Sequence, residues 1–271
     1  MFASNAGVQI HYTDTGGDGL PVVFAHGFFM DTTQFDPQQA LAEKGYRLIC
    51  WDARGHGRTQ APAGEPFTYW DLAHDCLAVM DHAGVDRAVI AGMSQGGYIA
   101  LRVALTAPER VESLILLDTT ADASTPEEKN QYISLFGAWC DPAVPLMPMA
   151  LQLAPQLIGG SAAQQQPWID KWISSDRAGI RDAADNLIDR DSVLDRLDEI
   201  TCPALVLRGD HDATSTAAKS ADLTQGLFGA GGVVVTIAGA GHAANWTHPE
   251  PTNAVLTAFL HLALHGLNPA P

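Results

Sequence analysis

The fold of this chain is decided by the stretch from Ala88 to Leu101, Ala-Val-Ile-Ala-Gly-Met-Ser-Gln-Gly-Gly-Tyr-Ile-Ala-Leu. Its first four residues are apolar and predict a buried strand, while the residues after Gly96 have the pattern of a helix. The chain must therefore turn sharply with Ser94 at the apex, and Gly92 and Gly96 keep side chains away from that turn. The helix that follows aims free backbone N–H groups at any negative oxygen formed on the serine. The same residues are also typical of a plain glycine-rich turn, and the wider chain decides between the two.

Composition and charge narrow the class of protein. The 271 residues, of which 46% are hydrophobic, suffice for one α/β domain with an inserted subdomain. Acidic residues outnumber basic ones 31 to 15, so neither a nucleic acid nor an anionic membrane is expected as a partner. The four cysteines form no C-x-x-C pair and indicate neither a zinc site nor a disulfide framework. Because no signal-like or membrane-spanning stretch stands out, we expect a soluble cytoplasmic protein.

Strand-like and helix-like segments alternate in the first 118 residues. Strands are predicted at 8–14, 20–25, 46–51, 88–91 and 111–118, and helices near 35–43, at 68–83 and from the serine turn to about 107. Such alternation is typical of a parallel sheet with helices on both faces.

The alternation stops after residue 118 and resumes after residue 200. Between residues 119 and 200 no strand-like run occurs, and several prolines interrupt the helical segments. Further elements are predicted as strands at 203–209 and 233–237, a last helix at about 251–264 and a frayed tail at 266–271. We interpret residues 1–118 and 201–271 as one core domain and residues 119–200 as a helical cap inserted into it.

Polar residues stand directly after the apolar runs, where parallel strands end at one edge of the sheet. The candidates at this edge are His26, Asp52, Ser94, Asp118, Asp210 or Asp212, and His242. A serine hydroxyl needs a nearby base, and that base needs a carboxylate that orients it and stabilises its charged form. His242 fits the base because it follows the last strand on a glycine-flanked loop, whereas the other histidines fall on predicted helices, an edge strand or turns.

Five motifs follow one another along the chain. They are His26-Gly-Phe28, Asp52-Ala-Arg-Gly-His-Gly57, Gly92-Met-Ser-Gln-Gly96, Gly209-Asp-His-Asp212 and Gly241-His242. With these motifs the chain resembles the α/β-hydrolases along nearly its whole length. The resemblance implies a mostly parallel eight-stranded sheet flanked by helices, with a helical cap insertion. It also implies Ser94 as the nucleophile, His242 as general base and then general acid, and Asp212 as the carboxylate that orients His242.

The same resemblance bears on the acid and on the oxyanion hole. Some members of the family carry the acid after the preceding core strand, where Asp118 stands, so Asp118 stays an alternative to Asp212. The backbone N–H groups of Phe28 and Gln95 are expected to form the oxyanion hole.

A mostly apolar pocket is expected over the serine. Phe29 would form part of its mouth, and the cap offers Trp139, Met147 and Trp168 as further lining. The same aromatic and methionine residues are also typical of a core between cap helices. No metal site is expected, because the histidines show no H-E-x-x-H or clustered spacing, and no cofactor is implied.

A serine at the turn indicates acyl transfer, since the family's dehalogenases and epoxide hydrolases use an aspartate there. The first prediction is hydrolysis of a small to medium, mostly apolar carboxylic ester. Lactonases, including enol-lactonases, and cofactor-free haloperoxidase-type perhydrolases share the triad and stay open as alternatives. A non-catalytic receptor for a small ligand is the alternative from a different class, and loss of a triad residue would favour it. The sequence leaves the oligomeric state open, a homo-oligomer included.

Overall fold

One sheet forms the centre of the molecule. The computed structural model describes residues 1–61 and 64–265, and within them eight strands are hydrogen-bonded in the order β1-β2-β4-β3-β5-β6-β7-β8. The strands are β1 (Phe2–Asn5), β2 (Val8–Asp14), β3 (Pro21–Ala25), β4 (Arg47–Trp51), β5 (Ala88–Met93), β6 (Val111–Leu117), β7 (Ala204–Gly209) and β8 (Val233–Ile237). Strands β3 to β8 run parallel to one another, and β1 and β2 pair antiparallel. The predicted mostly parallel eight-stranded sheet is confirmed.

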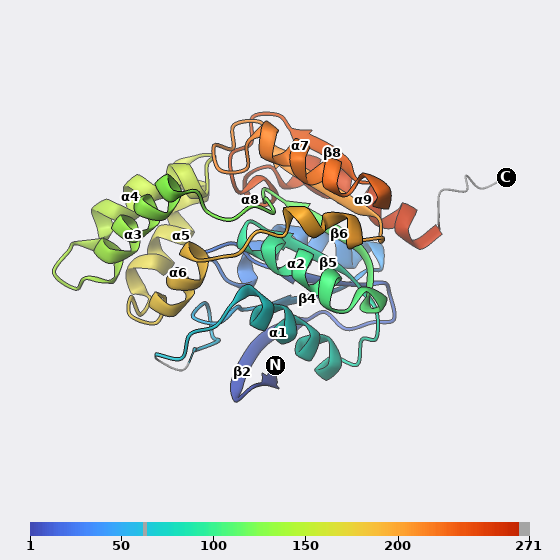
Figure 1. Cartoon of the computed structure of the whole chain (residues 1–271), viewed down its shortest axis with the longest axis horizontal. Coiled ribbons are helices and arrows are strands. Elements are labelled where there is room, and N and C mark those ends of the chain that lie inside the picture. Colours follow the sequence, from blue (N-terminus) through green and yellow to red (C-terminus); the bar gives the residue numbers. More distant parts are fainter. Residues whose placement is uncertain (62–63, 266–271) are drawn as a thin grey trace.

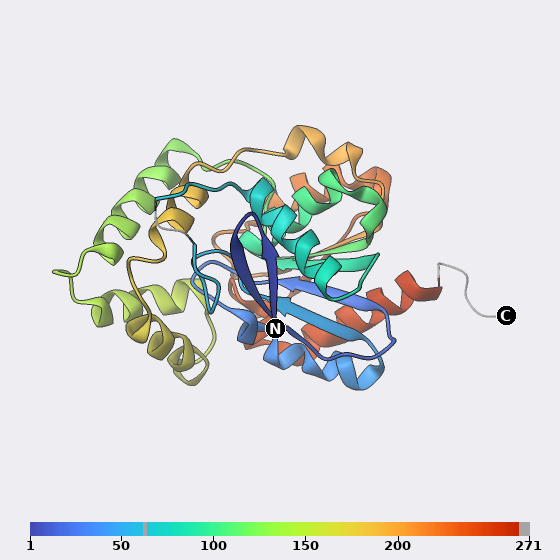
Figure 2. The same cartoon turned by 90° about the horizontal axis from the view of Figure 1, so that it is seen from below.

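Helices cover both faces of this sheet (Figures 1 and 2). On one face lie α1 (Tyr69–His82), α2 (Gln95–Thr106) and α7 (Ala217–Gly226), and on the other lie η1 (Thr32–Lys44) and α9 (Pro249–His265). Because both faces are covered, the central strands β3, β5, β6 and β7 consist almost entirely of buried residues. None of the described helices is both long enough and apolar enough to cross a membrane. Shorter helical turns are η2 (Pro108–Arg110), η3 (Leu194–Glu199), η4 (Phe228–Ala230) and α8 (Ala244–Thr247).

Two local features differ from the pattern in the sequence. Strand β1, which has only four residues and no readable periodicity, pairs with β2 across a tight turn in which Ala6 and Gly7 have φ of 47° and 80°. Positive φ at both central residues is typical of a two-residue hairpin. The helix expected near 35–43 is a 3₁₀ helix, η1, and it contains Pro37, which has no N–H to donate.

Four α-helices lie between β6 and β7, gathered at one end of the molecule (Figure 1). They are α3 (Pro126–Cys140), α4 (Leu146–Leu157), α5 (Ala162–Ser174) and α6 (Arg181–Ile188). Helix α3 packs against α6, and α4 packs against α5. No strand occurs between residues 119 and 200, all of which are described. The division into a core of 1–118 and 201–271 and a cap of 119–200 stays a prediction, and the tail at 266–271 lies outside the described residues.

The turn from β5 into α2 is crowded by backbone. Ser94 has φ of 53° and ψ of −117°, a conformation that non-glycine residues rarely adopt. A Cβ atom on Gly96 would overlap the carbonyl oxygen of Ala25 in β3, and one on Gly92 would overlap the backbone at Gly96. The backbone N–H of Ser94 donates to the carbonyl of Leu117 at 2.9 Å, which ties the turn to β6. The glycines of the motif are therefore required by the close packing of α2 on the sheet.

We expect Gly96→Ala to lower the free energy of unfolding by about 2 kcal/mol or more, because the added methyl group has no space against β3. Gly137→Ala is the matched control, since Gly137 is an exposed position of α3 with nothing within 4 Å of the added Cβ. There the same change should stabilise by about 0.5–1 kcal/mol, as alanine is the better helix former. Urea unfolding of both variants measures the difference, and equal effects at the two sites would contradict the steric explanation.

Candidate active site

Three residues far apart in the sequence form a chain of hydrogen bonds at the carboxyl edge of the sheet. Ser94 lies between β5 and α2, Asp212 follows β7, and His242 follows β8. His242 Nδ1 lies 2.9 Å from Asp212 Oδ2, and His242 Nε2 lies 3.0 Å from Ser94 Oγ. If Nδ1–H donates to the carboxylate, Nε2 is left to accept the hydroxyl proton of the serine.

Asp212 and His242 are both buried, and each stabilises the charged form of the other. Burial alone would raise the pKa of Asp212, but the charge and hydrogen bond of His242 and the N–H groups of Thr214 and Ser215 lower it below its usual value. Burial alone would lower the pKa of His242, but the charge and hydrogen bond of Asp212 raise it above its usual value. The pair is therefore suited to carry a proton on the imidazole.

Asp118, the alternative acid, is hydrogen-bonded to backbone instead of to His242. Its two oxygens accept from the N–H groups of Gly209, at 2.7 Å, and Ala244, at 3.2 Å. Burial and repulsion from Asp212 raise its pKa to about 8. Asp118 thus joins the end of β7 to the segment after His242, and the carboxylate that contacts the imidazole is that of Asp212.

The backbone N–H groups of Phe28 and Gln95 are free to bind an anion. Neither donates to an acceptor among the described residues. The Phe28 N–H belongs to the same peptide group as the Gly27 carbonyl, which accepts from His26 Nδ1 at 2.8 Å and from the Met30 N–H at 3.1 Å. Because a peptide group is planar, holding the carbonyl oxygen also holds the direction of the N–H.

The remaining polar candidates at this edge have structural partners. His26 Nε2 accepts from the N–H of Ala53 at 3.0 Å, and burial lowers the pKa of His26. Asp52 Oδ2 lies 2.8 Å from Nδ1 of His11, and Asp210 accepts a backbone N–H in the loop after β8 at 2.7 Å. These residues hold loops in place around Ser94 and do not touch it.

A buried cluster of side-chain amides joins the loop of Gly27 to the segment after His242. Gln34 Oε1 accepts from the Gly27 N–H at 2.8 Å, and Asn245 Nδ2 donates to the carbonyl of Gln34 at 3.2 Å and to Gln38 Oε1 at 3.0 Å. All three amides are fully buried. No pattern in the sequence points to this cluster, because Gln38 and Asn245 lie 207 residues apart.

A cavity of about 500 Å³ lies over Ser94 and His242, with most of its lining supplied by α3 and α4. The lining residues are Phe28, Phe29, Ser94, Tyr98, Glu128, Gln131, Tyr132, Leu135, Phe136, Met149, Gln152, Leu153, Gln156, Leu157, Leu187, Ala213, Thr214 and His242. This set holds no lysine or arginine, and the carboxylate of Glu128 is paired with Lys219 Nζ at 2.8 Å. The cavity therefore suits an uncharged and mostly apolar group.

The structure corrects part of the predicted pocket. Phe29 lines the cavity over Ser94, but Trp139, Met147 and Trp168 are not among its lining residues. Met147 is 44% exposed, and Trp168 is buried with its ring 5.4 Å from that of Trp246. A cap helix presents only one of its faces to the cavity, and apolar character alone does not say which face that is.

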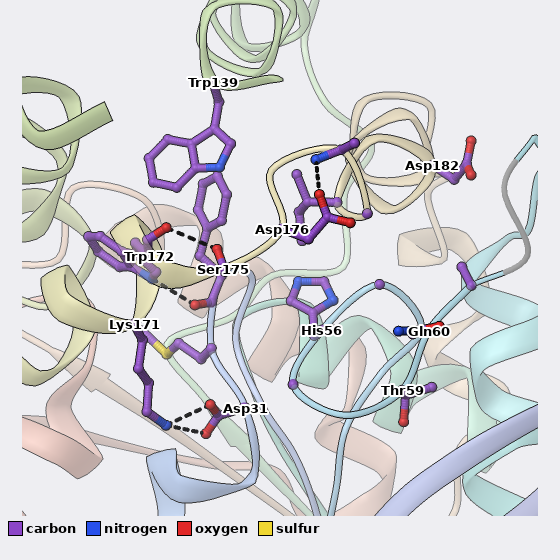
Figure 3. A pocket seen from close by; sticks show the side chains of 18 of the residues that line it. Asp31, His56, Thr59, Gln60, Trp139, Lys171, Trp172, Ser175, Asp176 and Asp182 are labelled. Carbon is purple, nitrogen blue, oxygen red and sulfur yellow. Dashed lines mark hydrogen bonds and ion pairs between the residues drawn. The ribbon is translucent and has the colours of Figure 1, made fainter. Parts of the chain in front are cut away.

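A second cavity, of about 520 Å³, adjoins the first at Phe29, and Figure 3 shows side chains that line it. It is lined by the turn at 55–61, by residues 171–182 and by Trp139, and Phe29 borders both cavities. Asp176 and Asp182 lie at this cavity, as Figure 3 shows. Within the residues that the structure describes, no group of three or more His, Cys, Asp or Glu side chains is placed to hold a metal ion.

Comparison with known proteins agrees with this architecture. The alpha/beta hydrolase fold family matches residues 21–142. A non-heme chloroperoxidase from Streptomyces lividans is 30% identical over 94% of this chain and 96% of its own. The 3-oxoadipate enol-lactonase 2 from Acinetobacter baylyi is 26% identical over 93% of each chain. A solved thermophilic esterase from Thermogutta terrifontis, 26% identical, has a TM-score of 0.87 over 97% of this chain and 98% of its own.

The chain therefore belongs to the α/β-hydrolase family, as its motifs predict. These relatives are named as an esterase, an enol-lactonase and a chloroperoxidase, so the fold alone does not determine the reaction. The substrate of this protein must therefore be inferred from the residues of its own site.

The contacts of His242 predict how its ring titrates. In the wild-type protein we expect a pKa above about 6.5, because the Asp212 charge outweighs burial. Asp212→Asn should bring the value below about 6.5, since burial remains and the charge is gone, and Asp118→Asn should lower it less. Imidazole NMR titration, assigned with His242→Gln, measures the three values. A larger drop in Asp118→Asn than in Asp212→Asn would make Asp118 the main partner.

Proposed function

We propose that this protein is a serine hydrolase that cleaves uncharged, mostly apolar carboxylic esters through an acyl-enzyme on Ser94. The observation that carries the proposal is the hydrogen-bonded chain from Ser94 Oγ to His242 to Asp212, beneath a cavity with many apolar side chains and no lysine or arginine. A nucleophile, a base and a group that orients the base within hydrogen-bond reach are what acyl transfer needs.

The first half of the proposed reaction forms the acyl-enzyme. His242 Nε2 takes the hydroxyl proton while Ser94 Oγ attacks the ester carbonyl carbon. The carbonyl oxygen becomes an oxyanion that accepts from the backbone N–H groups of Phe28 and Gln95. Asp212 stabilises the imidazolium, which then passes its proton to the departing alcohol.

The second half repeats these steps with water in place of the serine. His242 takes a proton from water, whose oxygen attacks the acyl carbon, and the same two N–H groups hold the second oxyanion. When that intermediate collapses, the imidazolium returns the proton to Ser94 Oγ and the carboxylic acid leaves. No metal or cofactor takes part in this scheme.

The lining of the cavity supports uncharged substrates. Its apolar side chains favour short aliphatic or aromatic acyl groups, and it holds no cation to pair with a carboxylate on the substrate. Residues 119–200 supply most of this lining, so we further propose that they act as a cap that selects the acyl group.

Lactonase and perhydrolase activities are the alternatives on the same residues. The likeness to an enol-lactonase supports the first, and the likeness to a chloroperoxidase supports the second. An uncharged lactone would fit the cavity, whereas a lactone that bears a carboxylate would leave that charge without a partner.

Ser94→Ala tests the nucleophile. We expect turnover of p-nitrophenyl butyrate to fall by at least about 10⁴-fold, because no other group can form the acyl-enzyme, while the urea midpoint changes little. Wild-type protein should also be labelled by a fluorophosphonate at this residue alone. Hydrolysis near the wild-type rate in Ser94→Ala would refute the mechanism.

A panel of matched substrates tests the substrate class. The ratio of kcat/KM for methyl butyrate over monomethyl succinate should exceed about 10², because a carboxylate in an apolar cavity without a cation costs several kcal/mol. Neutral γ-butyrolactone and acetic acid with peroxide complete the panel. Faster turnover of the charged ester would contradict the proposed preference for uncharged substrates. A rate of peracid formation higher than the rate of ester hydrolysis would favour the perhydrolase.

A further inference from the structure

The turn that carries the Phe28 N–H is tied to the cap by two residues of α5. Trp172 Nε1–H donates to the carbonyl oxygen of Phe29 at 2.7 Å. Lys171 Nζ lies 2.6 and 2.8 Å from the two carboxylate oxygens of Asp31, an ion pair drawn in Figure 3. The two contacts lie on either side of Met30, so α5 is bonded to this loop at both Phe29 and Asp31.

The backbone of this loop needs support from outside. Phe28 and Phe29 are the central residues of a turn that the Met30 N–H closes onto the Gly27 carbonyl at 3.1 Å. Phe29 has φ of 65°, in the left-handed region that this position of a turn normally reserves for glycine. A bulky residue persists there only when the surrounding contacts hold it. The hydrogen bond from Trp172 holds the carbonyl of the strained residue itself.

The second contact of α5 is charged. Burial opposes ionisation of Asp31, but the hydrogen bonds from Lys171 and Thr33 keep the pKa of this carboxyl below its usual value, so Asp31 offers Lys171 a carboxylate near neutral pH. Lys171 Nζ also lies 2.5 Å from Thr33 Oγ1. The start of η1 is therefore anchored to the same helix that holds Phe29.

We propose that Trp172 is a positioning residue for the oxyanion hole, which it serves by holding the 27–30 turn so that the Phe28 N–H faces the reacting oxygen. The inference rests on the proposed function. No residue of α5 lines the cavity over Ser94, and Trp172 and Lys171 border the second cavity instead. Trp172 thus acts on the reaction through the turn and not by touching the substrate.

The expected loss follows from how oxyanion holes work. Their donors stabilise the transition state because they are already in place, and deleting one donor costs about 10²–10³ in kcat. A displaced donor costs less, so Trp172→Phe should lower kcat by about tenfold. KM should change less than about twofold, because the apolar contacts of the bound ester are untouched.

Trp168→Phe is the matched control. Trp168 lies one turn earlier in α5, is 1% exposed, and its Nε1 has no acceptor among the described residues. Its ring lies near Lys171, a contact that phenylalanine can keep. Both changes remove one indole N–H from a buried position of the same helix, but only Trp172→Phe removes a hydrogen bond to the turn.

The experiment measures kcat, KM and the Ki of butylboronic acid, which forms a tetrahedral adduct with a serine, at a temperature well below the melting midpoint of each variant. In Trp172→Phe we expect kcat to fall and the Ki to rise by similar factors, while Trp168→Phe behaves as wild type. Lys171→Met, which removes the second contact, should shift both values in the same direction and serves if Trp172→Phe does not fold.

Three results would overturn the inference. They are a wild-type kcat in Trp172→Phe, equal losses in Trp172→Phe and Trp168→Phe, or a loss confined to KM. Ser94→Ala in the same assay keeps the two proposals apart. If Ser94→Ala abolishes turnover and Trp172→Phe does not lower it, only the positioning role fails, whereas activity that survives in Ser94→Ala would refute the proposed function itself.

Discussion

The approach of α2 to the sheet leaves no room for a side chain where Gly96 meets Ala25, and much of the structure depends on this contact. The close approach places the first turn of α2 at the carboxyl edge of β3 and β5, and it forces Ser94 into a positive φ that presents its hydroxyl. The strain at one residue is offset by the packing of the buried strands on either side. The same helix start leaves the Gln95 N–H unpaired beside the serine.

Electrostatics at the same edge separates two carboxylates, Asp212 and its sequence alternative Asp118. Asp212 contacts His242 and is kept ionised, whereas Asp118 accepts two backbone N–H groups, and its pKa is raised to about 8 by burial and by Asp212. Two buried negative charges this close are costly, so the partner that holds a cation keeps its charge more readily. Asp118 instead joins the end of β7 to the segment that follows His242.

Residues 119–200 make two kinds of contact near Ser94, and these come from different helices. Helices α3 and α4 turn apolar and amide side chains toward the cavity over Ser94, and α5 holds the turn of Phe29. Enclosing a substrate would require only the cavity lining of α3 and α4, and not the hydrogen bond from α5 to Phe29. The second contact ties the turn of Phe28 and Phe29 to α5, so the positioning that we propose for the Phe28 N–H depends on how α5 packs against this turn.

The sequence by itself determined seven of the eight strands, the helices α1, α2 and α9 and the polar residues at the strand ends, because hydrophobic periodicity and glycine placement act over neighbouring residues. It predicted neither the four-residue strand β1 nor helix α7. It did not show which cap residues face the cavity, nor the amide cluster of Gln34 and Asn245, nor the bond from Trp172 to Phe29. These depend on contacts between residues 143 to 211 positions apart. Only tertiary packing decides such contacts, since burial and hydrogen-bond partners are set by segments that local patterns do not relate to one another.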